Sequence, residues 1–242
     1  MARLPRLSLA GHAHLLTQTA SGGLRGFLDE SDADAFLGMV SEAASNRRVA
    51  VHGFRLAPDA FQILATPDDE SGISAFMQDI GRRYVRWVNT RHRRLGALWA
   101  GRFRSLLVQP GATLLAAMIF LDRRPGLAQT GLFEELPLRT SAEHYTGHRV
   151  SRFLVAPPPY WTLGDTPFAR EAAYASLVHQ GLDAPFQERI ATAIQSGRVL
   201  GDTDFIQNLE KVTSRPLSKG KPGRPHKRPS GPITEENRKK SE

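Results

Sequence analysis

Hydrophobic positions in the first half of the chain switch between a period of two and a period near 3.6. Residues 48–56 (RVAVHGFRL) and 61–66 (FQILAT) are rich in Val, Ile and Phe and flank the turn signal Ala57-Pro58-Asp59, which predicts a β-hairpin. From Ile73 to Val88, apolar residues recur at steps of three and four, which predicts a long helix. The same criteria predict further strands over 12–19 and 104–109 and further helices over 31–46 and 113–121, the first capped by Ser31 or Asp32.

The resulting order, β-α-β-β-α-β-α, predicts an α+β fold with a ferredoxin-like antiparallel sheet and helices on one face, over residues 1–125. Residues 126–161 are expected to form a linker, because the segment PPPYW at 157–161 favours a rigid extended chain. Residues 162–214 are expected to form a small helical appendix. Residues 215–242 have few apolar side chains and many Lys, Arg, Pro and Gly, so we expect a disordered basic tail.

The composition excludes several classes of protein. The 242-residue chain has no cysteine, which rules out disulfides, thiolate metal sites and a cysteine nucleophile. No apolar run reaches the roughly 18 residues that span a bilayer, so no membrane partner is expected. The N-terminal segment is a poor signal peptide, and we expect a cytoplasmic location, with which nucleoid association is compatible.

The net charge of +8 is distributed unevenly. The window from Ile80 to Leu121 has no Asp or Glu, and the tail from Arg215 carries nine Lys and Arg against three Glu. The rest of the chain is net acidic. Two basic elements on an acidic body favour DNA as the partner over a solvated helix face, because cations bind the phosphate backbone. The arginines of the window are Arg82, Arg83, Arg86, Arg91, Arg93, Arg94, Arg102 and Arg104.

Two further features bear on DNA binding. Trp99 and Phe103 are interleaved with the arginines and could stack on unpaired bases, or they could equally close the core. The tail segment at 219–228 is similar to an AT-hook, in which a Gly-Arg-Pro core lies in a narrow A/T-rich minor groove; its contacts would be Lys221, Arg224, Lys227 and Arg228. His226 replaces the usual arginine there, which weakens the match.

Several segments in order resemble the single-tyrosine (HUH-type) transposase family, above all its REP-associated branch, whose members nick and join single-stranded DNA at hairpins. Residues 27–32 (FLDESD) resemble the family's F-x-D-x-x-D segment, and residues 56–64 (LAPDAFQIL) lie over its L-M-P-N-H-x-H-L-L hairpin. Tyr84 to Asn89 with Arg91-His92 resembles the Y-x-x-x-x-N-x-R-H helix, and residues 98–105 (LWAGRFRS) resemble its L-W-x-G-R-F-K-S turn. The resemblance covers about residues 1–228.

The family's chemistry uses two histidines that hold Mg²⁺ or Mn²⁺ and a tyrosine that attacks the scissile phosphate. In this chain the two histidine positions fall on Ala60 and Gln62, and the tyrosine position falls on Met118. Alanine and methionine cannot fill these roles, and glutamine is a weak neutral ligand. The resemblance therefore implies a degenerate member that has no metal cofactor and no intact catalytic residue but still binds hairpin or single-stranded DNA, as a decaying relic or a domesticated protein.

Two alternatives stay open. The first is an active metal-dependent nicking enzyme with displaced residues: Tyr84 as the nucleophile and the closely spaced His12 and His14 as ligands. Its weakness is that Tyr84 lies on the helical core stripe. The second is an RNA-binding or protein-interaction module. Monomer and homodimer are both compatible with the sequence.

Overall fold

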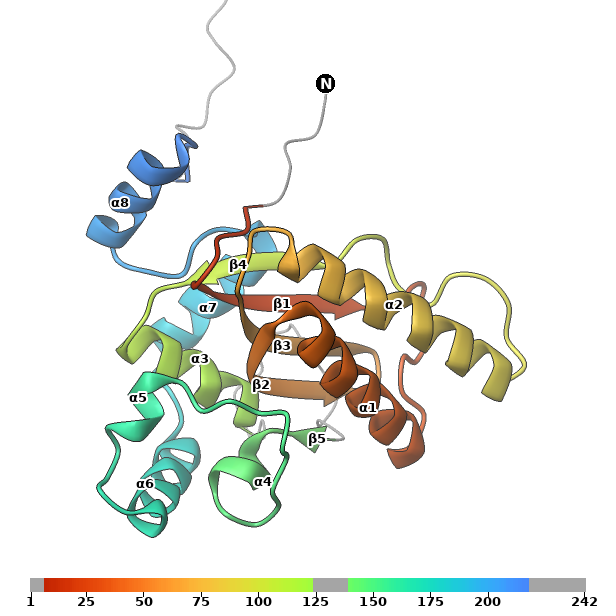
Figure 1. Ribbon diagram of the computed structural model, residues 1–242, viewed down its shortest axis with the longest axis horizontal. Helices are drawn as coiled ribbons and strands as arrows, with labels where there is room; N and C mark the ends of the chain where they lie inside the picture. Colours follow the sequence, from red (N-terminus) through yellow and green to blue (C-terminus); the bar gives the residue numbers. More distant parts are fainter. Residues whose placement is uncertain (1–6, 124–138, 218–242) are drawn as a thin grey trace, which may run out of the picture.

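The computed structural model describes residues 7–123 and 139–217 (Figure 1). Each element expected in the first half of the chain is present within a few residues of its predicted bounds. In chain order they are β1 (Ala13–Thr19), α1 (Glu30–Arg47), β2 (Val49–Ala57), β3 (Ala60–Pro67), α2 (Gly72–Arg91), β4 (Arg104–Val108) and α3 (Ala112–Asp122).

The sheet is antiparallel, with strand order β4-β1-β3-β2-β5, where β5 is the two-residue strand Arg139–Thr140. The α+β class is thus confirmed, and β1 to β4 have the β-α-β-β-α-β order that defines the ferredoxin-like arrangement. Central β3 pairs with β1 on one side and β2 on the other, so its residues are buried along nearly their whole length.

Helices cover both faces of the sheet, whereas the sequence predicted helices on one face. Phe61 of β3 packs against Phe36 of α1, with ring centroids 4.7 Å apart, on the face that α1 and α2 cover. Its neighbour Gln62 points to the opposite face, because side chains alternate along a strand. Gln62 pairs in register with Arg55 of β2, whose guanidinium donates to the carbonyl of Arg123 at the end of α3. The end of α3 therefore lies over this second face.

The segment expected to be a linker packs against the sheet from Arg139 onward. It contains β5, the short helix α4 (Ala142–Tyr145) and α5 (Pro158–Trp161). The prediction of an extended chain at 157–161 was wrong: Pro157 is extended, and the four residues after it form the short helix α5, because proline suits the first positions of a helix. The Tyr145 hydroxyl donates to the carbonyl of His52 at 2.6 Å, and Val155 N–H donates to Val51 O at 2.8 Å.

Three helices follow within the region 162–214 that was expected to be helical: α6 (Pro167–Gln180), α7 (Ala184–Ser196) and α8 (Thr203–Thr213). Of these, α6 and α7 share the core of the sheet. Tyr174, Ile190 and Ile194 belong to the same buried cluster as the strands. Leu200 extends the sheet at its β4 edge, where its N–H donates to Leu107 O and its carbonyl accepts from Gln109 N–H, both at 2.8 Å.

No helix among residues 7–123 and 139–217 is long and apolar enough to cross a membrane. The basic segment at 219–228, with the expected minor-groove contacts Lys221, Arg224, Lys227 and Arg228, lies outside the described residues.

Candidate nucleic-acid interface

The two acidic residues of the 27–32 segment meet the Arg91-His92 pair at the end of α2. Asp29 is the N-cap of α1, in place of the expected Ser31 or Asp32, and its side chain accepts from Asp32 N–H at 3.0 Å. Asp32 is fully buried and accepts hydrogen bonds from Leu28 N–H, Arg91 and His92 Nε2. Arg91 also donates two hydrogen bonds of 2.8 Å to the carboxylate of Asp29, and these lower the pKa of Asp29 to about 2. These motif residues therefore fix the end of α2 against the start of α1.

An aromatic cluster lies beside this network. The Tyr84 ring is stacked near Trp99, with centroids 6.0 Å apart, and Trp99 also meets the edge of Phe61 at 5.1 Å. Tyr84 is fully buried, and its hydroxyl donates to Gly26 O at 2.8 Å. Trp99 and Phe103 are both partly buried and pack against the core, the arrangement that the sequence left as the alternative to base stacking.

The loop between α2 and β4, residues 92–103, is held at both ends. Asn89 Nδ2 donates to Gly96 O at 3.0 Å, and Ala100 N–H donates to Thr19 O at 2.8 Å. Arg93 adopts a left-handed backbone conformation with φ of 50°, which turns the chain sharply after the helix. Leu95 at the far side of the turn is 97% exposed. The loop thus presents Arg93, Arg102 and Leu95 outward from a fixed base.

The eight arginines of the acid-free window differ in how they are engaged. Arg91 is bound by Asp29 and Asp32, as described above. Arg83 pairs with Glu42 at 2.5 Å, and Arg104 donates to the carbonyl of Gln195 at 3.1 Å. The other five form no ion pair with any residue that the structure describes: Arg82, Arg86, Arg93, Arg94 and Arg102.

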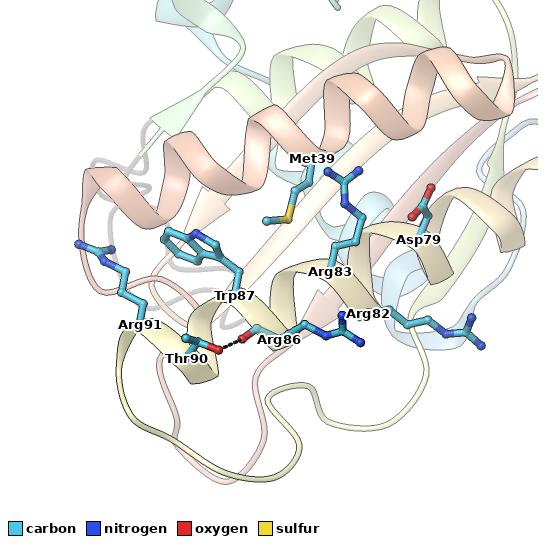
Figure 2. A pocket seen from close by; sticks show the side chains of 8 residues that line it. All are labelled: Met39, Asp79, Arg82, Arg83, Arg86, Trp87, Thr90 and Arg91. Atoms are coloured by element: carbon cyan, nitrogen blue, oxygen red, sulfur yellow. Dashed lines mark hydrogen bonds between the residues drawn. The ribbon is translucent and has the colours of Figure 1, made fainter.

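A groove of about 630 Å³ runs between α1 and the second half of α2 (Figure 2). Met39 reaches from α1 toward α2 beside the Trp87 indole, and the arginines of α2 line the rest. Hydrophobic periodicity places Trp87 on the core stripe of α2 and Met39 on the apolar face of α1. In the structure both are only partly buried, at the margin of that stripe. The sequence carried a signal for the partial burial of Trp87, because this residue directly follows Arg86 and so lies at the edge of the apolar face of the helix.

Of the three positions at which the resemblance expects catalytic groups, two lie on β3 and the third lies on α3. Ala60 and Gln62 lie two apart on β3 and point to the face that α3 covers. On α3, Met118 is fully buried on the stripe that includes Leu121, and a Cβ added at Gly53 of β2 would lie 3.4 Å from Leu121 Cδ1. Neither amide atom of the buried Gln62 side chain has a hydrogen-bond partner among the described residues.

A polar cluster occupies the end of this space. Asp122 is almost completely buried and accepts from the hydroxyls of Ser141 and Tyr174, at 2.6 and 2.7 Å. Burial raises the pKa of Asp122 to about 7, against the opposing effect of these hydrogen bonds. Arg55 lies close enough for an electrostatic interaction with this carboxyl. Asp122, the last residue of α3, thus joins this helix to Ser141, which directly follows β5, and to Tyr174 of α6.

The residues of the displaced-chemistry alternative are poorly placed for catalysis. Burial raises the pKa of Tyr84 well above its usual value, so its hydroxyl is a poor source of phenolate. His14 is buried, with Nδ1 at 3.3 Å from Ser105 Oγ, and burial lowers its pKa to about 4, whereas His12 contacts the carbonyl of Ala10 at 3.0 Å. Within the described ranges no three His, Asp or Glu side chains group as a metal site would require.

No protein-family model matches the chain, and no curated protein sequence matches it at a significant level. Among solved structures, the fold is similar to a REP-associated tyrosine transposase bound to a REP hairpin, with 11% identity and a TM-score of 0.48 over 66% of this chain and 93% of that one. It is also similar to a candidate transposase from Deinococcus radiodurans R1, with 19% identity and a TM-score of 0.34 over 46% of this chain and 86% of that one. Both TM-scores are below 0.5. Function is therefore argued from the residues of this chain.

Proposed function

We propose that this chain is a degenerate member of the REP-associated transposase class that binds hairpin or single-stranded DNA through α2 and the loop 92–103. The observation that carries the proposal is the set of five arginines on these two elements without an ion pair to any described residue. Cations without an intramolecular partner can bind phosphate without first breaking a contact. Arg83 can join them, because an exposed ion pair such as the one it forms with Glu42 contributes little and is easily exchanged.

Strand transfer is absent in this proposal. Ala60 and Met118 have no group that could hold a metal or attack phosphorus, and the Gln62 amide is buried between the sheet and α3. Tyr84, the tyrosine of the displaced-chemistry alternative, is enclosed by aromatic rings and engaged with a carbonyl. The tail contributes a second contact through Lys221, Arg224, Lys227 and Arg228 on A/T-rich duplex DNA, a proposal that rests on the sequence alone.

Binding is tested by fluorescence anisotropy with a labelled hairpin DNA over a range of KCl concentrations. Arg86→Ala and Arg93→Ala should each weaken binding to all DNA sequences and reduce the salt slope by about one. Arg152→Ala, which removes an exposed arginine near the other end of α1, should leave the slope unchanged. A hairpin of the same sequence in RNA that binds tenfold tighter would overturn the choice of DNA.

Catalysis is tested by incubating the protein with the DNA hairpin and Mg²⁺ or Mn²⁺. The expected result is no nicked strand and no covalent protein–DNA adduct. An adduct that forms in the natural chain and disappears in Tyr84→Phe would instead show that the chemistry has moved to this tyrosine.

A further inference from the structure

We infer that Leu95 is an apolar wedge, a side chain that separates neighbouring bases, and that it enters a DNA hairpin where the duplex stem meets the loop. The inference rests on the proposed function, since it names the residue of the 92–103 loop that would distinguish a hairpin from other DNA. Leu95 is 97% exposed, more than any other large apolar side chain that the structure describes. Single leucines on a surface are ordinary, but the turn that carries this one is fixed on both sides.

Asn89, in the last turn of α2, holds the two residues that flank Leu95. Its backbone carbonyl accepts from Arg94 N–H at 2.8 Å, and its side-chain amide donates to the carbonyl of Gly96 at 3.0 Å. Arg93 and Gly96 have positive φ values of 50° and 89°, so the chain turns sharply on either side of Leu95. A left-handed backbone is unfavourable for a residue with a Cβ atom, and Arg93 keeps it because these contacts hold the turn. Little freedom would therefore be lost when Leu95 meets a ligand.

The loop is anchored again beyond the turn. Leu98 is fully buried, and its carbonyl accepts from Ser21 N–H at 2.8 Å. In Figure 1, the end of α2 and the loop after it project past the ends of the strands. A nucleic acid can thus approach Leu95 without meeting the rest of the sheet.

Cations accompany the leucine on both arms of the loop. Arg93 and Arg102 are exposed and form no ion pair with any residue that the structure describes. Asp29, which contacts the end of α2, is already paired with Arg91. An apolar tip between cations suits a base stack with a phosphate backbone on either side, and proteins that insert leucine between base steps also use arginines. A partner that offered only an apolar pocket would leave both guanidinium groups without a counter-charge.

The junction between stem and loop is where insertion costs least. Inside a duplex a wedge must separate two stacked base pairs, whereas the last pair of a stem has a paired neighbour on one side only. Burial of the leucine can therefore offset the cost of unstacking at the junction before it can do so within the stem. Leu95 would thus favour a hairpin over a continuous duplex, while the arginines bind both.

The test places the fluorescent base 2-aminopurine, which brightens when it is unstacked, at the last pair of the stem or at mid-stem. Saturation with the natural chain should raise the junction signal about twofold or more and leave the mid-stem signal unchanged. Leu95→Ala should remove most of this rise and weaken hairpin binding about 5- to 30-fold. Its affinity for a blunt duplex of the stem sequence should change by less than about twofold, because the phosphate contacts remain.

Matched variants separate the wedge from other effects. Leu95→Met keeps an apolar side chain and should keep the junction signal. Phe168→Ala, at a side chain that is 79% exposed on α6, should change neither signal nor affinity. Asn89→Ala should lower the hairpin preference as Leu95→Ala does, and the double variant should lose no more than either single variant, because both changes remove the same wedge.

Each contrary result has its own meaning. A junction signal that rises equally with Leu95→Ala, or an equal loss of affinity for hairpin and duplex in that variant, would overturn the wedge while leaving DNA binding intact. Losses that add in the double variant would show that Asn89 does not position Leu95. Failure of the natural chain to bind either DNA would instead overturn the proposed function itself.

Discussion

Asp32 illustrates how one side chain can organise the candidate interface. Its carboxylate is fully buried, yet it receives a backbone N–H, a guanidinium and an imidazole, so its charge and lone pairs are satisfied. The sequence pattern marked Asp29 and Asp32 as a motif, but it could not show which of the two caps α1 and which is buried against α2. Their three-residue spacing puts one at the helix cap and the other on the first turn facing inward, and only packing against α2 decides which is which.

We predict that Asp32→Ala lowers the free energy of unfolding by about 2–3 kcal/mol, because Leu28 N–H and His92 lose their acceptor, while Arg91 keeps its two hydrogen bonds to Asp29. Urea unfolding followed by circular dichroism measures the change. Glu42→Ala, which removes the exposed partner of Arg83, serves as the control and should lower the free energy by less than about 1 kcal/mol. Equal losses in the two variants would show that the Asp32 network is not a structural anchor.

At the scale of elements, hydrophobic periodicity predicted the first seven helices and strands well but missed β5, α4 and α5. These three are short, of two to four residues, and a period cannot be read from so few positions. These short elements are held in place by long-range contacts, such as the hydrogen bond from Tyr145 to the His52 carbonyl. Asp122 is the clearest example, since its partners lie far along the chain: Ser141 between β5 and α4, and Tyr174 in α6.

We predict a pH dependence of stability that Asp122 causes. Its pKa of about 7 in the folded chain exceeds its ordinary value of 3.8, so the folded state binds more protons than the unfolded state between pH 4 and 7. The contribution of this group is fully present below pH 4 and is lost as the pH rises through 7, at up to about 1.4 kcal/mol per pH unit. Nearby Arg55 favours the carboxylate and limits this slope.

Urea unfolding of the natural chain and of Asp122→Asn, at several pH values from 4 to 8, isolates this contribution as the difference between the two. His14 and His52, whose pKa values burial lowers, contribute a slope of opposite sign below pH 6.5 in both proteins and cancel in the difference. Asp202→Asn, at an exposed helix cap where asparagine is also a good cap, should retain the Asp122 slope. A difference that does not vary with pH would refute the raised pKa.

At the scale of the whole molecule, the region expected to be a separate appendix shares the buried cluster of the sheet. Tyr174, Ile190 and Ile194 pack into it, and Leu200 pairs with the β4 edge. The domain boundaries drawn from the sequence remain a prediction that unfolding can test.

We predict that the appendix and the sheet open together. In native-state hydrogen exchange followed by mass spectrometry, the slowest amides of α6 and α7 should report the same opening free energy as those of β2 and β3, within about 1 kcal/mol. Amides of α8, which buries a single residue of its own, provide a reference that exchanges sooner. An opening free energy several kcal/mol lower in α6 and α7 than in the sheet would favour an independent appendix behind a linker.

The sequence by itself determined the α+β class, the bounds of the long elements and the acid-free run of arginines, because these depend on local periodicity and composition. Its resemblance to the transposase family also predicts that Ala60, Gln62 and Met118 replace the groups a nicking enzyme needs. Only the tertiary structure decided which cations and aromatic rings are available to a ligand. Arg91 is used internally, Trp99 packs against the core and Trp87 lines a groove, and each of these outcomes depends on contacts between residues far apart in the chain.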